Sequence, residues 1–194
     1  MPRMYKSEDD PMSHLGYNGR MTDQTSILRQ TALTFISAFE TLSTETFASL
    51  QAPSYIHTFA PASCNPPAAL DGAHFIQHLS SMRDIMRGFP VRPKEVFVNE
   101  GLNQVTVYAD SETWFHEDVK DDSVPADEWL YHGEYIFILD MDDSQTKIKR
   151  VFEFLDSKGT EQLRVLLSKA RQNRAASQAG GSLESGQKPA PRWQ

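Results

Sequence analysis

The spacing of apolar residues changes once along this chain, and the change limits the folds that the chain can adopt. Up to about residue 89, apolar side chains recur every three or four positions, which is typical of amphipathic helices. From residue 95 they alternate, which is typical of strands that bury one face. Helices followed by a series of hairpin-connected strands predict an α+β fold: a cone-shaped, curved antiparallel sheet packed against N-terminal helices.

Four segments have helical spacing: residues 25–42, 44–50, 72–89 and 160–172. Asp71 directly precedes the third segment and is expected to cap it, because an aspartate side chain accepts hydrogen bonds from the free amides of a first helical turn. Strand spacing is found in residues 54–61, 95–101, 102–116, 131–141 and 147–157. An acidic segment, residues 117–128, is expected to be a surface loop that could cover a pocket.

Composition divides the chain into three parts. Residues 1–24 mix charges with Pro and Gly and are interpreted as a flexible N-terminal arm. Residues 25–172 form one folded domain with a C-terminal helix. Residues 173–194 are rich in Ala, Gly, Ser and Pro, so they bury too little apolar surface to offset chain entropy, and we expect a disordered tail.

Charge and cysteine content exclude several classes of partner. The net charge is −7 and no basic run occurs, which argues against nucleic acid or an anionic membrane surface as partner. No apolar run approaches the ~20 residues of a membrane span. Cys64 is the single cysteine, so no disulfide can form within the chain, and we expect a reducing, cytoplasmic location.

The segment 131–157 predicts a hairpin in which each strand carries a glutamate amid apolar residues. A two- or four-residue loop centred on Asp143 and Ser144 places Glu134 directly opposite Glu153, with His132 on the same face. Two carboxylates about 5 Å apart repel by about 3 kcal/mol at an effective dielectric near 20. One of them would then hold a proton near neutral pH, as in a general acid–base pair.

These segments resemble a known family. The run 54–79, with its Tyr-x-His, proline-rich loop and helix, followed by 132–157 with its Glu-Phe-x-Asp ending, resembles SnoaL-like polyketide cyclases. It is also similar to the related limonene-epoxide hydrolases of the nuclear-transport-factor-two-like superfamily. The long acidic loop and polar termini resemble fungal secondary-metabolism members. The resemblance implies a cone fold, no cofactor, no metal, a hydrophobic small-molecule substrate and a homodimer.

The resemblance also assigns site residues. In the hydrolases the acid that matches Glu153 faces the pocket and activates water, and the positions that match Tyr55 and His57 line the same pocket. Two departures weaken the epoxide-hydrolase assignment. The hydrolases have an Arg-x-Asp where this chain has Gln104 and Thr106, and an asparagine where it has His57.

The predicted catalytic residues are His57, Glu153, Glu134 and His132, and the predicted substrate-binding residues are Tyr55, Thr106, Tyr108 and Asp110. Each has a structural alternative: the glutamates could pair with basic residues on an outer face, and His57 with Tyr55 could be a hydrogen-bonded core pair. His74 and His78 have metal-compatible helical spacing but no third ligand.

Two functions from different classes fit these residues. The first is a cofactor-independent cyclase, isomerase or dehydratase that acts by acid–base chemistry on a polyketide- or terpenoid-like intermediate of secondary metabolism. The second is a non-catalytic small-molecule-binding or dimerisation module of the same fold. The substrate, the choice among cyclisation, isomerisation, dehydration and hydrolysis, and the direction in which the Glu134/Glu153 face points stay open at the level of sequence.

Overall fold

The computed structural model describes residues 26–121 and 123–184 and has four α-helices over this part of the chain. The helices are α1 (Ile27–Ser37), α2 (Thr44–Leu50), α3 (Gly72–Arg83) and α4 (Ser157–Glu184). The strands are β1 (Gln51–Ala60), β2 (Leu70–Asp71), β3 (Met86–Gly88), β4 (Val91–Asn99), β5 (Gln104–Glu112), β6 (Trp114–Phe115), β7 (His132–Met141) and β8 (Ile148–Leu155).

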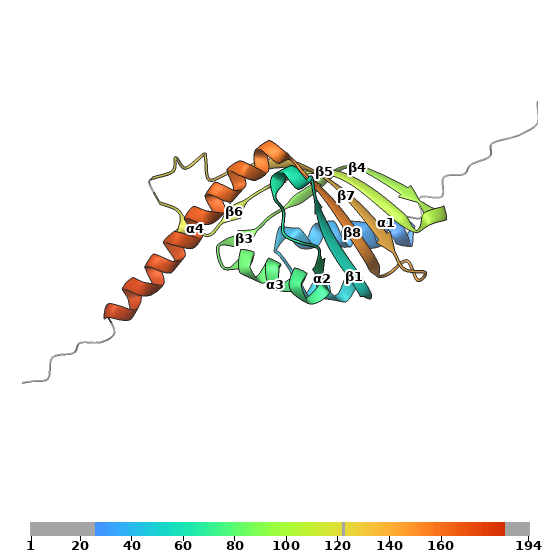
Figure 1. Cartoon of the computed structure of the whole chain (residues 1–194), viewed down its shortest axis with the longest axis horizontal. Helices are drawn as coiled ribbons and strands as arrows, with labels where there is room; N and C mark the ends of the chain where they lie inside the picture. The colour runs from blue at the N-terminus through green and yellow to red at the C-terminus, as the bar shows by residue number, and fades with distance from the viewer. Residues whose placement is uncertain (1–25, 122, 185–194) are drawn as a thin grey trace, which may run out of the picture.

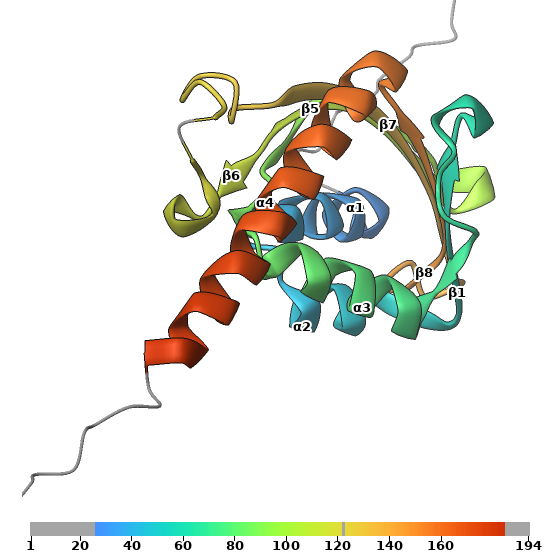
Figure 2. The ribbon, with the colours of Figure 1, turned by 60° about the vertical axis from the view of Figure 1, so that its left-hand side comes forward.

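Six strands form one curved sheet in the order β2-β1-β8-β7-β5-β4, and β3 pairs with β6 in a separate two-stranded sheet. Helices α1 to α3 lie inside the curve of the large sheet, and α4 crosses its open end (Figures 1 and 2). The predicted α+β architecture is therefore confirmed. The sheet is mixed rather than fully antiparallel, because β1 runs parallel to β8. The connection from β1 to the rest of the sheet passes through helix α3, which allows that direction.

Polar caps fix where the first three helices begin. Ser26, Ser43 and Asp71 each accept a hydrogen bond from the backbone N–H three residues later, at 3.3, 3.2 and 2.9 Å. The capping role predicted for Asp71 is thus confirmed. Helix α3 ends at Arg83 rather than near residue 89, because Met86–Gly88 form a strand paired with β6.

Helix α4 continues well beyond residue 172, to Glu184. The prediction of a disordered tail is therefore wrong for residues 173–184. Asn173 donates to the carbonyl of Val119 at 2.8 Å, and Arg174 forms an ion pair with Asp118 at 2.5 Å. These contacts attach this part of the helix to the acidic segment, which sequence composition alone does not show. The predicted arm at 1–24 and the residues from 185 onward lie outside the described part of the chain.

The hairpin of β7 and β8 has a different register from the one predicted. Glu153 pairs with Phe137, not with Glu134, and the pairing is interrupted between Asp140 and Met141. The connection is longer than four residues: Asp142 N–H donates to the carbonyl of Lys147 at 2.8 Å, and Gln145 adopts a left-handed conformation with φ of 60°. An odd shift of register exchanges the faces, so the predicted Glu134/Glu153 pair does not exist.

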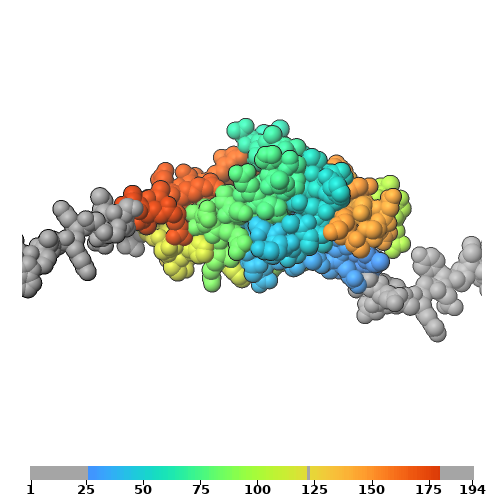
Figure 3. All heavy atoms as spheres, turned by 90° about the horizontal axis from the view of Figure 1, so that it is seen from below, coloured from blue at the N-terminus to red at the C-terminus, as the bar shows by residue number. Residues whose placement is uncertain are grey.

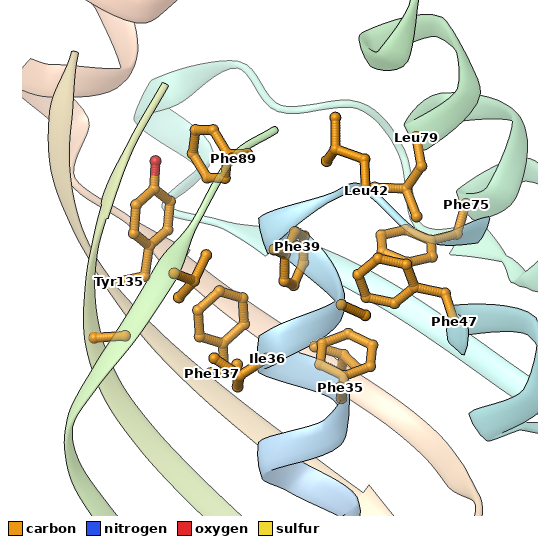
Figure 4. Close-up of a cluster of buried hydrophobic side chains, with 14 of the residues drawn as sticks. Phe35, Ile36, Phe39, Leu42, Phe47, Phe75, Leu79, Phe89, Tyr135 and Phe137 are labelled. Carbon is orange, nitrogen blue, oxygen red and sulfur yellow. The ribbon is translucent and has the colours of Figure 1, made fainter. Parts of the chain in front are cut away.

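The core lies between the concave face of the sheet and helices α1 to α3. Figure 4 shows Ile36 of α1, and Phe39 just after α1, projecting towards Phe137 of β7. Phe35 of α1 lies instead beside Phe47 of α2 and Phe75 of α3. The rings of Phe39 and Phe47 are 4.8 Å apart in an edge-to-face arrangement. Seen from below, α2 and α3 form a continuous outer surface over this core (Figure 3). This packing leaves only one end of the cone for access to the concave face.

Candidate active site

A hydrogen-bonded chain of three side chains lies on the concave face, where β1 meets β8. Tyr55 Oη is 2.9 Å from His57 Nδ1, and His57 Nε2 is 2.8 Å from Glu153 Oε2. His57 is fully buried, and Tyr55 and Glu153 are 3% and 7% exposed. Burying a carboxylate is costly unless it is hydrogen-bonded, so His57 is the group that permits Glu153 to occupy this position.

The direction of the hydrogen bonds in this chain follows from the tyrosine. Burial, with a smaller contribution from the Glu153 carboxylate, raises the pKa of Tyr55 well above its usual value, so Tyr55 keeps its proton. A protonated Tyr55 can donate to His57 Nδ1, and His57 then donates from Nε2 to Glu153. The chain therefore runs from Tyr55 through His57 to Glu153.

Stacking also holds the His57 ring in place. It stacks on Phe75 with a centroid distance of 4.4 Å and an interplanar angle of 14°, and it contacts Phe59 at 4.5 Å. Because the ring has little freedom to rotate, the bonded oxygen of Glu153 is fixed. The other oxygen, Oε1, has no hydrogen-bond partner among the described residues.

Glu153 borders a cavity of about 160 Å³ between the sheet, α3 and α4. Its floor consists of buried side chains, among them Phe39, Phe75, Leu79, Phe89 and Tyr135. Its mouth consists of the prolines at 66 and 67 and of side chains from α4: Thr160, Leu163, Arg164, Leu167 and Arg171. An apolar pocket with few polar groups is the usual form of a small-molecule site.

His78 projects into the same cavity from α3, and its ring nitrogens have no hydrogen-bond partner among the described residues. Burial lowers the pKa of His78, and the Glu153 carboxylate opposes that change in part. His78 is therefore a neutral imidazole at neutral pH. Glu153 thus faces the cavity as a candidate proton acceptor, and the neutral imidazole of His78 faces it as a hydrogen-bonding group.

Five of the predicted site residues lie on the convex face of the sheet, away from the cavity. These are His132, Glu134, Thr106, Tyr108 and Asp110. On β5 the buried positions are Val105, Val107 and Ala109, so the alternate residues point outward. These five therefore do not border the cavity. The assumed register of the β7–β8 hairpin accounts for the misplacement of Glu134 and His132, whereas Thr106, Tyr108 and Asp110 had been chosen from the match to the hydrolase strand.

Glu134 has the environment of a surface residue. Its carboxylate accepts from Tyr108 Oη at 2.7 Å and pairs with Lys94 at 2.5 Å, and its side chain is 57% exposed. Lys94, followed by Tyr108, lowers the pKa of Glu134. It is thus a solvated ion pair, which was the structural alternative given for this residue.

The structure adds cavity residues that sequence reasoning missed: His78, Tyr135, Arg164 and Arg171. His78 had been considered only as a metal ligand with His74, whose side chain is 65% exposed and bonds to Asp71. Arg164 and Arg171 are seven positions apart, two helical turns, and so share one side of α4 next to Leu163 and Leu167. That spacing was a usable signal.

The described part of the chain shows neither a metal-site arrangement nor a membrane-spanning helix. Within residues 26–121 and 123–184, no group of three or more His, Cys, Asp or Glu side chains has the arrangement of a metal site. No helix in the described part of the chain is long and apolar enough to cross a membrane.

Comparison with known proteins places this geometry in context. No protein-family model matches the chain. The sequence is 28% identical over 133 residues to "Austinoid biosynthesis cluster protein H" of Aspergillus calidoustus, covering 67% of this chain and 83% of the relative. Among solved structures, AusH from Aspergillus nidulans matches with a TM-score of 0.56 and 24% identity over 68% of this chain and 84% of its own.

Two other solved structures extend the comparison. The BvnE pinacolase from Penicillium brevicompactum matches with a TM-score of 0.62 and 19% identity, covering 73% of this chain and 91% of its own. A protein from Shewanella denitrificans OS-217, assigned as a SnoaL-like polyketide cyclase, matches with a TM-score of 0.55 and 13% identity, covering 72% and 98%.

The chain therefore has a SnoaL-like cone fold, with a hydrogen-bonded Glu153–His57 pair beside its apolar pocket. The resemblance expected from the sequence is confirmed at the level of fold.

Proposed function

We propose that this protein is a cofactor-independent enzyme of secondary metabolism, a cyclase, isomerase or dehydratase, that uses Glu153 as its general base. The observation that carries the proposal is the 2.8 Å bond from His57 to Glu153 at an otherwise apolar cavity. The stability of the fold does not by itself require a carboxylate there. Apolar residues of similar volume often stabilise a core at least as well as a buried ion pair.

The chemistry follows from the free oxygen of Glu153. Oε1 accepts a proton from a carbon next to a substrate carbonyl, and the electron pair of that C–H bond forms an enolate. The enolate carbon then attacks a second carbonyl to close a ring, is reprotonated at another position, or expels a β-hydroxyl that leaves as water. In each case the proton that Glu153 accepted returns from Glu153, to the new alkoxide, to carbon or to the departing hydroxide, so no oxidant or cofactor is consumed.

His57 and Tyr55 act through Glu153 rather than on the substrate. Both are buried behind the carboxylate, and neither borders the cavity. We infer that they are positioning residues, which hold one oxygen of Glu153 so that the other faces the substrate. We therefore propose that His57 positions Glu153, in place of the role of catalytic acid or base that the sequence suggested.

The named relatives support this class of function. They include a pinacolase and proteins of austinoid biosynthesis and polyketide cyclisation. The family resemblance of the sequence implies the same class of substrate, a polyketide- or terpenoid-like intermediate.

Two subsidiary proposals complete this assignment. We propose a homodimer formed through the convex face, where Phe97, Ile136 and Phe154 are 57%, 41% and 43% exposed. Two ion pairs flank this patch, Arg150 with Asp140 and Lys94 with Glu134. Each presents one positive and one negative group, so a second copy of the chain can meet the patch with complementary charges. We also propose a cytoplasmic location, which the buried free thiol of Cys64 supports.

The decisive experiment uses the native host, because the substrate is unidentified. Deleting the gene should cause one intermediate to accumulate, as measured by mass spectrometry of culture extracts. Wild-type protein added to that purified intermediate should consume it, and Glu153→Gln should not. Full turnover by a correctly folded Glu153→Gln would refute the assignment of the base.

A further inference from the structure

Helix α4 carries three arginines near the mouth of the cavity, and two of them are fully engaged. Arg164 donates to the carbonyls of Cys64 and Asn65 and pairs with Glu161 at 2.8 Å. Arg174 donates to the carbonyl of Asp84 at 3.0 Å and pairs with Asp118 at 2.5 Å. These two guanidinium groups attach α4 to the rest of the fold.

Arg171 differs from both. It borders the cavity, it is exposed, and it has no hydrogen bond, ion pair or ring contact within residues 26–121 and 123–184. Asp84 borders a neighbouring hollow with Arg171, yet no ion pair joins them. The five donors of Arg171 are therefore available to a ligand.

The charges of the cavity lie at opposite ends. Glu153 is at the buried floor, and Arg171 is at the exposed mouth. The intervening walls are mostly aromatic and aliphatic; the polar exceptions are His78, Thr160 and Arg164, whose guanidinium is already occupied. An anionic group on a ligand is repelled by the Glu153 carboxylate and attracted by the Arg171 guanidinium, so it points outward while the neutral part enters.

The size of the cavity agrees with this orientation. About 160 Å³ is close to the volume of an engineered protein cavity that accepts benzene. A single ring therefore fills the floor, and the rest of a larger substrate extends past α4 towards Arg171. Bidentate binding of a planar carboxylate is the interaction that a free guanidinium forms best.

We propose that Arg171 binds a carboxylate of the substrate at the cavity mouth, which makes the substrate class organic acids with an apolar ring system. This inference deepens the proposed function and rests on it, because the ligand is a substrate only if the protein is an enzyme. The binding site itself does not depend on turnover.

The test compares acids with neutral analogues of the same shape. Cinnamate and 2-naphthoate, and their amides cinnamamide and 2-naphthamide, are titrated into the full chain by calorimetry. We expect each acid to bind at least about tenfold more tightly than its amide, in line with a charge-assisted bidentate contact. Arg171→Gln should reduce this ratio to near one, and Arg171→Lys should retain part of it.

Arg174→Gln is the matched control on the same helix, since its guanidinium is already occupied, and it should preserve the acid preference. The inference is overturned if acids bind no better than amides, if the preference survives Arg171→Gln, or if no acid binds at millimolar concentration. A preserved acid preference together with active Glu153→Gln would refute the proposed base and leave the Arg171 site standing.

Discussion

His57 Nε2 lies 2.8 Å from Glu153 Oε2, although the two residues are 96 positions apart in the chain. The parallel pairing of β1 with β8 brings them together. His57 pairs with Val151 and Phe59 with Glu153, so the histidine and the glutamate are diagonal neighbours on the same concave face. A parallel strand pair thus creates the polar centre of an otherwise apolar pocket.

The first prediction concerns the two glutamates of β7 and β8. Glu153→Gln should lower kcat by about 10² to 10⁴, the usual contribution of a general base, because the amide cannot accept a proton. The fold should survive, since glutamine has the same shape and still accepts a hydrogen bond from His57. Turnover of the accumulated intermediate by purified protein is the measurement.

Glu134→Gln is the natural control for that substitution. Its carboxylate is on the convex face and pairs with Lys94, so kcat should stay within about twofold of the wild-type value. A comparable loss in both variants would show that Glu153 is not distinguished by its place in the cavity.

The second prediction concerns the chain behind the carboxylate. His57→Gln cannot bond to Tyr55 and Glu153 at once, so a buried polar group loses its partner, and unfolding free energy should fall by about 1–3 kcal/mol. Tyr55→Phe should cost about 1 kcal/mol, because only one hydrogen bond is removed. Urea unfolding measures both.

Activity separates a positioning role from a purely structural one. If His57 positions Glu153, His57→Gln lowers kcat while KM changes little, even at temperatures where the variant is fully folded. An unchanged kcat in the folded variant would assign His57 to stability alone.

The fold class was accessible from sequence because periodicity reports which face is buried, and helix caps such as Asp71 report where helices begin. The parallel pairing of β1 was not accessible, since strand direction depends on the path of the connection around α3. Residues 173–184 were misassigned for a similar reason: Asn173 and Arg174 form tertiary contacts that composition does not encode.

The site was predicted in part, and the reason is the loop between β7 and β8. His57, Tyr55 and Glu153 were selected by family resemblance, and the structure places them in one hydrogen-bonded chain. Glu134 and His132 were selected from an assumed loop length. Gln145 adopts φ of 60° and lengthens the loop, and the resulting register moves both residues to the convex face. The length of this loop sets the register of the hairpin, and the register sets which glutamate faces the pocket.

The third prediction concerns pH and His78. Burial lowers the pKa of His78 below the ordinary histidine value of 6.5, so protonation favours the unfolded chain. Its contribution to stability is therefore complete above about pH 6.5 and is lost as the pH falls below that value. His78→Gln should lose less stability than the wild-type protein between pH 7 and pH 5, as measured by urea unfolding at each pH.

His74→Gln on the same helix is the control, because the side chain of His74 is 65% exposed. It should lose as much stability as the wild-type protein over this range. Equal pH dependence in His78→Gln and wild type would show that His78 is not the buried neutral imidazole that the cavity geometry indicates.

The fourth prediction tests the proposed homodimer. Phe154 pairs with Ile136, which pairs with Tyr108, so these side chains form a row across the convex face. Phe154→Asp places a charge in the middle of that row and should shift the protein from dimer to monomer in light scattering after gel filtration. Val165→Asp is the control: Val165 is 67% exposed on α4, away from the sheet, and its substitution should leave the mass unchanged. A wild-type protein that is monomeric at micromolar concentration would refute the dimer, and a dimer that persists in Phe154→Asp would place the interface elsewhere.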